Sequence, residues 1–170
     1  MTLSKFVWAG LTCYFLCACA GYRLGPTNGL AAGARSVRIY PFQNQTPEPG
    51  LVEPVVSALR KSFQQDGTYR LSTQGDGDIS VRGILTRYER QGLSFQPGDI
   101  LTVRDFNVVL AAKVTAVERG TGRVILDQEV SGRTTLRVGS ALASVERLAW
   151  PLLAEDLARN VAALLVEGKW

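Results

Sequence analysis

The stretch of sequence that decides the fold is LTVRDFNVVLAAKVTAVERGTGRVILDQEVSGRTT, residues 101–135. Two extended segments flank Gly120-Thr121-Gly122, and a short turn rich in glycine between such segments is typical of a β-hairpin. Apolar side chains occupy alternate positions of the first segment, as they do in a half-buried strand. Their parity changes along it, because Leu101 and Val103 are odd whereas the apolar residues from Phe106 onwards are even.

One extra residue in the strand would explain this change of parity. We therefore predict a β-bulge near Arg104-Asp105. In the returning strand, residues 123–135, we expect three apolar side chains to face the core: Val124, Leu126 and Val130.

Further strands are predicted upstream of this hairpin. Residues 36–40 place Val37 and Ile39 on one face and predict the first strand. Residues 79–89 alternate in the same way, and residues 69–72 predict a short extended piece.

Two segments have the apolar spacing of amphipathic helices. Residues 51–66 form the first, and Gly67 is suited to end it in a left-handed conformation. Residues 140–167 form the second, in which Pro151 either kinks the helix or lies in the first turn of another. The expected apolar stripe of this segment is Val145, Leu148, Leu152, Leu153, Leu157, Val161, Leu164 and Leu165.

This order of elements predicts an α+β fold. We expect a two-layer sandwich over residues 35–170, with a mostly antiparallel four-stranded sheet and two helices packed on one face. The opposite face is then expected to be more apolar than a freely solvated sheet, which indicates a docking surface for a protein, a deeper core, a third layer or ordinary apolar surface. The apolar residues expected on that face are Ile84, Tyr88, Val109, Ala111, Val117 and Ile125.

The composition argues against an enzyme. The 170 residues include no His, and all three Cys lie within the first 19 residues. A Ser-His-Asp triad, a Cys-His pair, a zinc finger and an internal disulfide are therefore impossible beyond that point. We expect no cofactor and no metal site. The formal net charge is only +4, with no basic run interleaved with aromatic residues, so nucleic acid is not an expected partner.

The N-terminus predicts a lipid anchor. Residues 1–18 read MTLSKFVWAGLTCYFLCA, a signal peptide whose apolar run is too short to span a bilayer. The run ends in Leu16-Cys17-Ala18-Cys19, which matches the bacterial lipobox. We predict that Cys19 is acylated and that residues 19–34 form a lipidated tether. The alternatives are an ordinary secretory signal and an uncleaved anchor. Ala20 in place of Asp favours delivery to the outer membrane, facing the periplasm.

Residues in four places carry a resemblance to a known family. Gly-Tyr-Arg-Leu at 21–24 follows Cys19 after one intervening Ala and resembles the start of the LptE family of lipopolysaccharide-assembly lipoproteins. The motif Val-Arg-Ile-Tyr-Pro-Phe-x-Asn-x-Thr at 37–46 and the helical run at 153–161 resemble that family too, as does Ala-Leu-Arg-Lys ahead of Gly67.

The resemblance implies a function without catalysis. It implies an outer-membrane lipoprotein that plugs and supports the LptD β-barrel and binds lipopolysaccharide during its delivery to the cell surface. Arginines near strand ends and loops are suited to phosphates, and we predict Arg87, Arg90 and Arg104 as lipopolysaccharide contacts, although each is also suited to solubilising the surface. The pattern at 37–46 also resembles periplasmic lipoproteins that regulate a peptidoglycan synthase or form part of a secretion channel.

Overall fold

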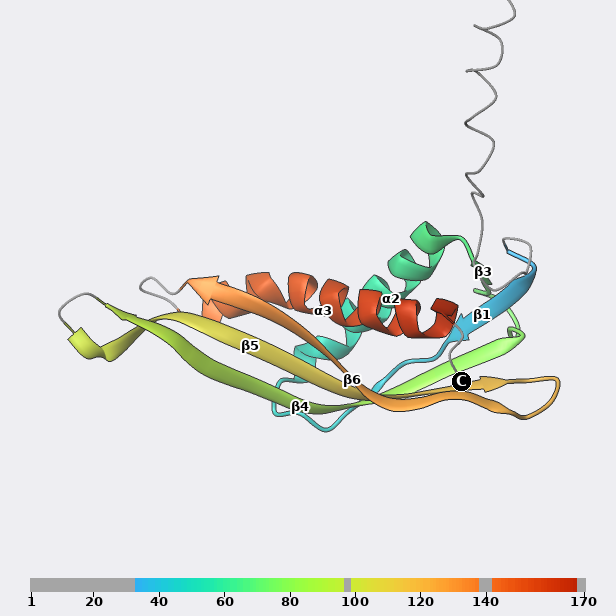
Figure 1. The fold of residues 1–170 in the computed structure, drawn as a ribbon, viewed down its shortest axis with the longest axis horizontal. Helices are drawn as coiled ribbons and strands as arrows, with labels where there is room; N and C mark the ends of the chain where they lie inside the picture. Colours follow the sequence, from blue (N-terminus) through green and yellow to red (C-terminus); the bar gives the residue numbers. More distant parts are fainter. Residues whose placement is uncertain (1–32, 97–98, 138–141, 168–170) are drawn as a thin grey trace, which may run out of the picture.

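The computed structural model describes residues 33–96, 99–137 and 142–167. Figure 1 shows a long curved sheet with two helices over one of its faces, as expected. The strands are β1 (Arg35–Ile39), β2 (Gln43–Asn44), β3 (Tyr69–Leu71), β4 (Ile79–Gln96), β5 (Asp99–Glu118) and β6 (Val124–Arg137), and the helices are the 3-10 turn η2 (Pro49–Leu51), α2 (Val52–Asp66) and α3 (Leu142–Glu167).

The sheet is mixed and has six strands, so the prediction of a mostly antiparallel four-stranded sheet is wrong in this detail. The strand order is β3-β1-β4-β5-β6, and β2 also pairs with β4. β1 pairs in parallel with β3 and β4, and β2 pairs in parallel with β4. β4, β5 and β6 form the antiparallel part. The difference has two causes. α2 connects β1 to the neighbouring β3, and this connection makes the two strands parallel. Strands of two or three residues, such as β2 and β3, are also too short to show the alternation of apolar and polar side chains that predicts a strand.

The long hairpin of β5 and β6 and its predicted bulge are confirmed. Asp105 pairs with Ser94 and Val103 pairs with Phe95, so Arg104 is the extra residue. A second irregularity falls at Ile125, because Ala116 pairs with Leu126 whereas Val117 pairs with Val124. This shift buries Ile125 and leaves Val124 54% exposed, so the inward position predicted for Val124 is wrong.

The uncovered face of the sheet is more polar than predicted. A register shift in β4 makes Thr86 an extra residue, after which Tyr88 points to the helical side and contacts α3. Tyr88 and Ile125 therefore do not belong to the uncovered face. The apolar residues that remain on it alternate with charged ones, among them Arg82, Lys113 and Glu129.

Both helices form where the apolar spacing predicts them. α2 buries Val55, Leu59 and Phe63 and ends at Gly67, whose φ of 72° is left-handed. α3 is one helix that continues through Pro151, so the proline does not begin a second helix.

The apolar stripe of α3 is narrower than predicted. Leu153, Leu157 and Leu165 are buried, but Leu148 and Leu152 are 78% and 58% exposed, so the core positions predicted for those two are wrong.

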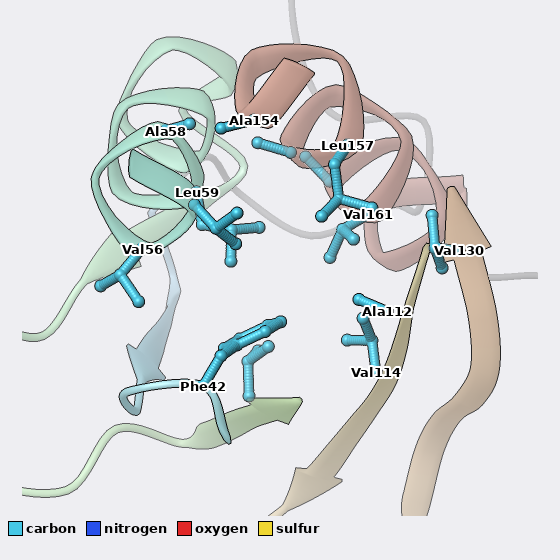
Figure 2. Close-up of a cluster of buried hydrophobic side chains, with 14 of the residues drawn as sticks. Phe42, Val56, Ala58, Leu59, Ala112, Val114, Val130, Ala154, Leu157 and Val161 are labelled. Atoms are coloured by element: carbon cyan, nitrogen blue, oxygen red, sulfur yellow. The ribbon is translucent and has the colours of Figure 1, made fainter. Parts of the chain in front are cut away.

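The core lies between the two helices and the sheet (Figure 2). Ala58 of α2 and Ala154 of α3 face each other, and such small side chains allow two helices to approach closely. Phe42 fills the space over Gly83, where a Cβ atom would lie 2.2 Å from the ring. Each large side chain buried in this layer contributes about 1.5–3 kcal/mol.

α3 also hydrogen-bonds to the outer edge of β6. The Arg133 backbone N–H donates to Asp156 Oδ2 at 3.0 Å, and Asn160 Nδ2 donates to the Ser131 carbonyl at 2.8 Å. Between these residues, Gly132 lies against the backbone of α3 near Leu157. The helix is therefore attached to the sheet by polar contacts as well as by its apolar side.

Candidate functional site

The two ends of the molecule differ. At one end lie the start of β1 and the turn between β5 and β6 (Figure 1). At the other end the ladder of β4 and β5 extends past both helices. β1 follows the predicted tether in the sequence, and the β4–β5 extension lies at the end of the described chain opposite to the start of β1.

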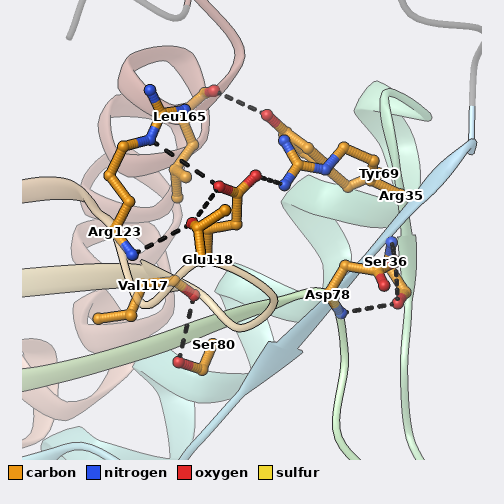
Figure 3. A network of polar contacts seen from close by, with 10 residues as sticks. Arg35, Ser36, Tyr69, Asp78, Ser80, Val117, Glu118, Arg123 and Leu165 are labelled. Atoms are coloured by element: carbon orange, nitrogen blue, oxygen red, sulfur yellow. Dashed lines mark hydrogen bonds and ion pairs between the residues drawn. The ribbon is translucent and has the colours of Figure 1, made fainter.

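Polar contacts hold the start of β1 in place (Figure 3). Glu118 at the end of β5 forms an ion pair with Arg35 and accepts a hydrogen bond from Thr121. Hydrogen bonds from Thr121 and Arg35 lower the pKa of Glu118. Asp78 accepts hydrogen bonds from the backbone N–H and the hydroxyl of Ser36, both at 2.7 Å, and these lower its pKa. The domain is thus fastened directly after the predicted tether.

Arg87 lies on the uncovered face of the sheet. Its Nε is 3.7 Å from Glu89 Oε1, and its Nη2 is 3.8 Å from Glu129 Oε1 of β6. Both distances are long for ion pairs in solvent, which contribute little stability. Another anion can therefore replace these carboxylates beside Arg87.

Arg90 lies on the opposite, helical side of the sheet. Its Nη1 is 3.3 Å from Glu146 Oε2 of α3, and the Glu146 side chain is only 8% exposed. Glu146 also accepts the hydroxyl hydrogen bond of Tyr88. Burial and this hydrogen bond raise the pKa of Tyr88. The indole Nε1 of Trp150 is buried here without a hydrogen-bond partner among the described residues.

Arg104 is the exposed extra residue of the β5 bulge. Its neighbour Asp105 accepts hydrogen bonds from Ser94 and, at 3.0 Å, from Arg137 Nε, and both lower the pKa of Asp105. The structure does not bring the three predicted arginines together, because Arg87 and Arg90 lie on opposite faces and Arg104 lies farther along the extension. Cys19, the predicted acylation site, lies outside the described residues.

The structure forms a basic surface that does not include the three predicted contacts. Arg82 of β4 lies over the ring of Tyr40, which follows β1, with its guanidinium carbon 4.6 Å from the ring centroid. The alternation of Arg38 and Tyr40 in the first strand predicts that the two share a face, but only the pairing of β1 with β4 places Arg82 beside them.

Two results bear on membranes and metals. Within residues 33–96, 99–137 and 142–167, no helix combines the length and the apolar character needed to cross a bilayer. In the same described part of the chain, no group of three or more His, Cys, Asp or Glu side chains is arranged to hold a metal ion.

Solved structures share this fold. A Xanthomonas campestris protein from a family of unknown function superposes with a TM-score of 0.61 at 9% identity, over 86% of this chain and 91% of that one. A hypothetical protein from Chlamydia trachomatis gives a TM-score of 0.52 at 9% identity, over 75% and 93%. A candidate lipoprotein from Caulobacter crescentus gives 0.51 at 8% identity, over 74% and 88%. No curated protein matches the chain.

At these identities the likeness shows the fold alone. It defines a class of small α+β domains in which two helices cover one face of a mixed sheet, and this class includes a candidate lipoprotein. The family is shown by the sequence itself. The model of the LptE family, described as lipopolysaccharide-assembly, matches residues 34–165. The chain belongs to the LptE family, whose members are non-enzymatic lipopolysaccharide-assembly lipoproteins of the outer membrane.

Proposed function

We propose that this protein plugs and supports an LptD-like β-barrel in the outer membrane and binds lipopolysaccharide during its transport and assembly at the cell surface. The observation that carries the proposal is the family match, which spans nearly all of the described chain. The protein acts by position and contact, without chemistry of its own.

The anchor is the first part of this proposal. Residues 1–18 are the signal peptide, Cys19 is the acylated residue, and residues 19–34 are the tether of a single domain over 35–170. The start of β1 at Arg35 and of the family match at residue 34 supports this division. The contacts of Arg35 with Glu118 and of Ser36 with Asp78 let the first strand bear a pull from the membrane.

Docking in the barrel is the second part. The interior of an outer-membrane barrel is polar, so a plug needs a polar surface. The uncovered sheet face is such a surface, since Lys113 of β5 lies near Asp127 of β6 and Arg87 of β4 lies near Glu129 of β6. The exposed Leu148 and Leu152 of α3 add an apolar contact where a barrel wall or a loop approaches.

Lipopolysaccharide binding is the third part. Arg87, Arg90 and Arg104 are the proposed contacts, because guanidinium groups bind phosphates with paired hydrogen bonds. Arg87 and Arg90 are partly exposed, at 53% and 44% of their side chains, although carboxylates already lie beside them. A phosphate must therefore compete with Glu129 for Arg87 and with Glu146 for Arg90.

Copurification of the full chain in mild detergent tests the docking. We expect a large β-barrel protein to copurify in a defined ratio. A peptidoglycan synthase, or a ring of identical subunits, would instead support the alternative class of periplasmic lipoprotein and contradict this proposal.

Two substitutions test the other parts. Cys19→Ala should abolish palmitate labelling, and labelling that persists would show that the predicted lipobox is wrong. Replacing Arg87, Arg90 and Arg104 together by Gln should weaken lipopolysaccharide binding and lower its dependence on salt. The matched control replaces Arg60, Arg123 and Arg159 and removes the same charge elsewhere. Equal losses in both triple variants would contradict the assignment of contacts.

A further inference from the structure

A groove on the uncovered face of the sheet contains none of the arginines considered above for lipopolysaccharide. It has a volume of about 590 Å³ and lies where the chain leaves β1 and enters β2 beside β4 and β5. β1 and β2 both pair with β4. The Tyr40 backbone N–H still donates to the Val81 carbonyl at 3.0 Å, but Pro41 and Phe42 do not continue the ladder. Phe42 turns into the core there, and Tyr40 and Pro41 form one wall of the groove.

This wall carries a fixed cation. The Arg82 guanidinium lies 4.6 Å from the centroid of the Tyr40 ring, and that of Arg38 lies 5.9 Å from the same centroid. The Tyr40 hydroxyl donates to Asp76 Oδ1 at 3.1 Å, and Asp76 pairs with Arg119 at 2.9 Å. These contacts hold the ring, and the ring attracts the Arg82 guanidinium that lies over it. Among the described residues no carboxylate forms an ion pair with Arg82, so its N–H donors are not committed to an internal acid.

The opposite wall carries a second cation that can move. Lys113 of β5 is 56% exposed, and its Nζ is 3.8 Å from Asp127 Oδ1. That oxygen also accepts the hydroxyl hydrogen bond of Thr115 at 3.0 Å. Because the ion pair is long and exposed, it contributes little stability, and Lys113 can turn toward an anion in the groove at small cost.

The rest of the lining combines apolar Pro41 and Ile84, which lie on the two sides, with Gly83 and the polar side chains of Gln43 and Thr115. A groove that combines a planar cation, a mobile cation and apolar walls is suited to an anion attached to a ring with C–H faces. A bare inorganic ion would leave the apolar walls unused.

We infer that this groove binds a phosphate group carried on a saccharide, with Arg82 as the bidentate donor, Lys113 as the second cation, and Pro41 and Ile84 against the sugar ring. The inference rests on the proposed function, since lipopolysaccharide would supply a phosphorylated sugar. It places that contact at Tyr40 and Arg82, apart from Arg87, Arg90 and Arg104.

The experiment is a calorimetric titration of the full chain in detergent with glucosamine 1-phosphate, inorganic phosphate and lipopolysaccharide. Arg82→Gln should weaken glucosamine 1-phosphate binding about tenfold or more, the range of a lost charge-assisted hydrogen bond. Arg82→Lys should also weaken it, because a lysine keeps the charge but lacks the planar fork. Arg70→Gln is the control, because Arg70 is an exposed arginine of β3 outside the groove.

Ile84→Ser tests whether the groove contacts a sugar ring as well as a phosphate group. It should weaken binding of glucosamine 1-phosphate several-fold more than binding of inorganic phosphate. Equal effects on the two probes, or equal affinity of the wild-type chain for them, would overturn the assignment to a saccharide.

Unchanged affinity in Arg82→Gln and Arg82→Lys would overturn the site. Because two variants are measured, a loss of binding seen in both is not explained by a folding defect in one of them. Binding of lipopolysaccharide distinguishes failure of the groove from failure of the proposed function. If wild type binds lipopolysaccharide and both Arg82 variants bind it equally well, only the groove is refuted. If wild type does not bind lipopolysaccharide, its proposed role as a lipopolysaccharide-binding protein is refuted.

Discussion

Replacing Gly132 by Ala should separate α3 from β6. A Cβ atom at this position would lie 2.5 Å from the Leu157 backbone nitrogen, 2.7 Å from the Leu153 carbonyl oxygen and 2.8 Å from the Leu157 Cα. The shortest of these distances is about 0.9 Å below the 3.4 Å at which ordinary van der Waals contact begins. All three atoms belong to the helix backbone, so no rotation of a side chain can relieve the clash.

The expected cost has two contributions. Overpacking of this kind costs about 1–3 kcal/mol of the free energy of unfolding. As α3 retreats, the hydrogen bonds of Asp156 and Asn160 to the edge of β6 lengthen from 3.0 and 2.8 Å, and each is worth about 0.5–1.5 kcal/mol. We therefore expect Gly132→Ala to lower the free energy of unfolding by about 2–6 kcal/mol.

Equilibrium unfolding in urea, followed by circular dichroism, measures this loss. Gly120→Ala is the matched control, because a Cβ at Gly120 would meet no atom within 4 Å. We expect the control to change stability by less than about 0.5 kcal/mol. If Gly132→Ala costs no more than Gly120→Ala, the close contact between α3 and β6 is not a feature of the folded protein.

Three further predictions follow from the packing and the polar contacts. Leu157→Ala should cost about 2–5 kcal/mol in urea unfolding because Leu157 is fully buried, whereas Leu148→Ala in the same helix should cost less than about 0.5 kcal/mol. Tyr88→Phe should cost about 1–3 kcal/mol because it leaves the buried Glu146 with Arg90 as its remaining partner; no loss would mean that water replaces the hydroxyl. Ser36 lowers the pKa of Asp78 from its ordinary 3.8, so this contribution to stability is present above pH 3.8 and is lost as the pH falls through the folded value. Ser36→Ala keeps the hydrogen bond of the backbone N–H but removes that of the hydroxyl, so the acid dependence of the urea midpoint should become shallower without being abolished. An unchanged dependence would contradict the role of the hydroxyl hydrogen bond.

The sequence could predict the elements with long, regular periods. The β5–β6 hairpin, its bulge at Arg104 and the helix that ends at Gly67 are all found. Each leaves a local signal, such as a change of parity or a glycine where a left-handed residue is needed.

The errors arose where tertiary structure decides the outcome. The extra residues Thr86 and Ile125 have no glycine or proline to mark them, yet each reverses which side chains face the helices. Helical spacing placed Leu148 in the core, but a period shows only that residues share a face and not how far the sheet extends beneath it. Arg82 and Tyr40 are far apart in the sequence, and only the parallel pairing of β1 with β4 makes them neighbours.

The contacts of Asp156 and Asn160 with β6 have a consequence for how the molecule behaves alone. β6 is the last strand of the sheet, and unpaired N–H and C=O groups along such an edge can recruit a strand from another molecule. Because α3 side chains already occupy the groups of Arg133 and Ser131, a foreign strand cannot extend the sheet there. This part of the sheet edge is thereby protected against strand pairing between copies of the chain.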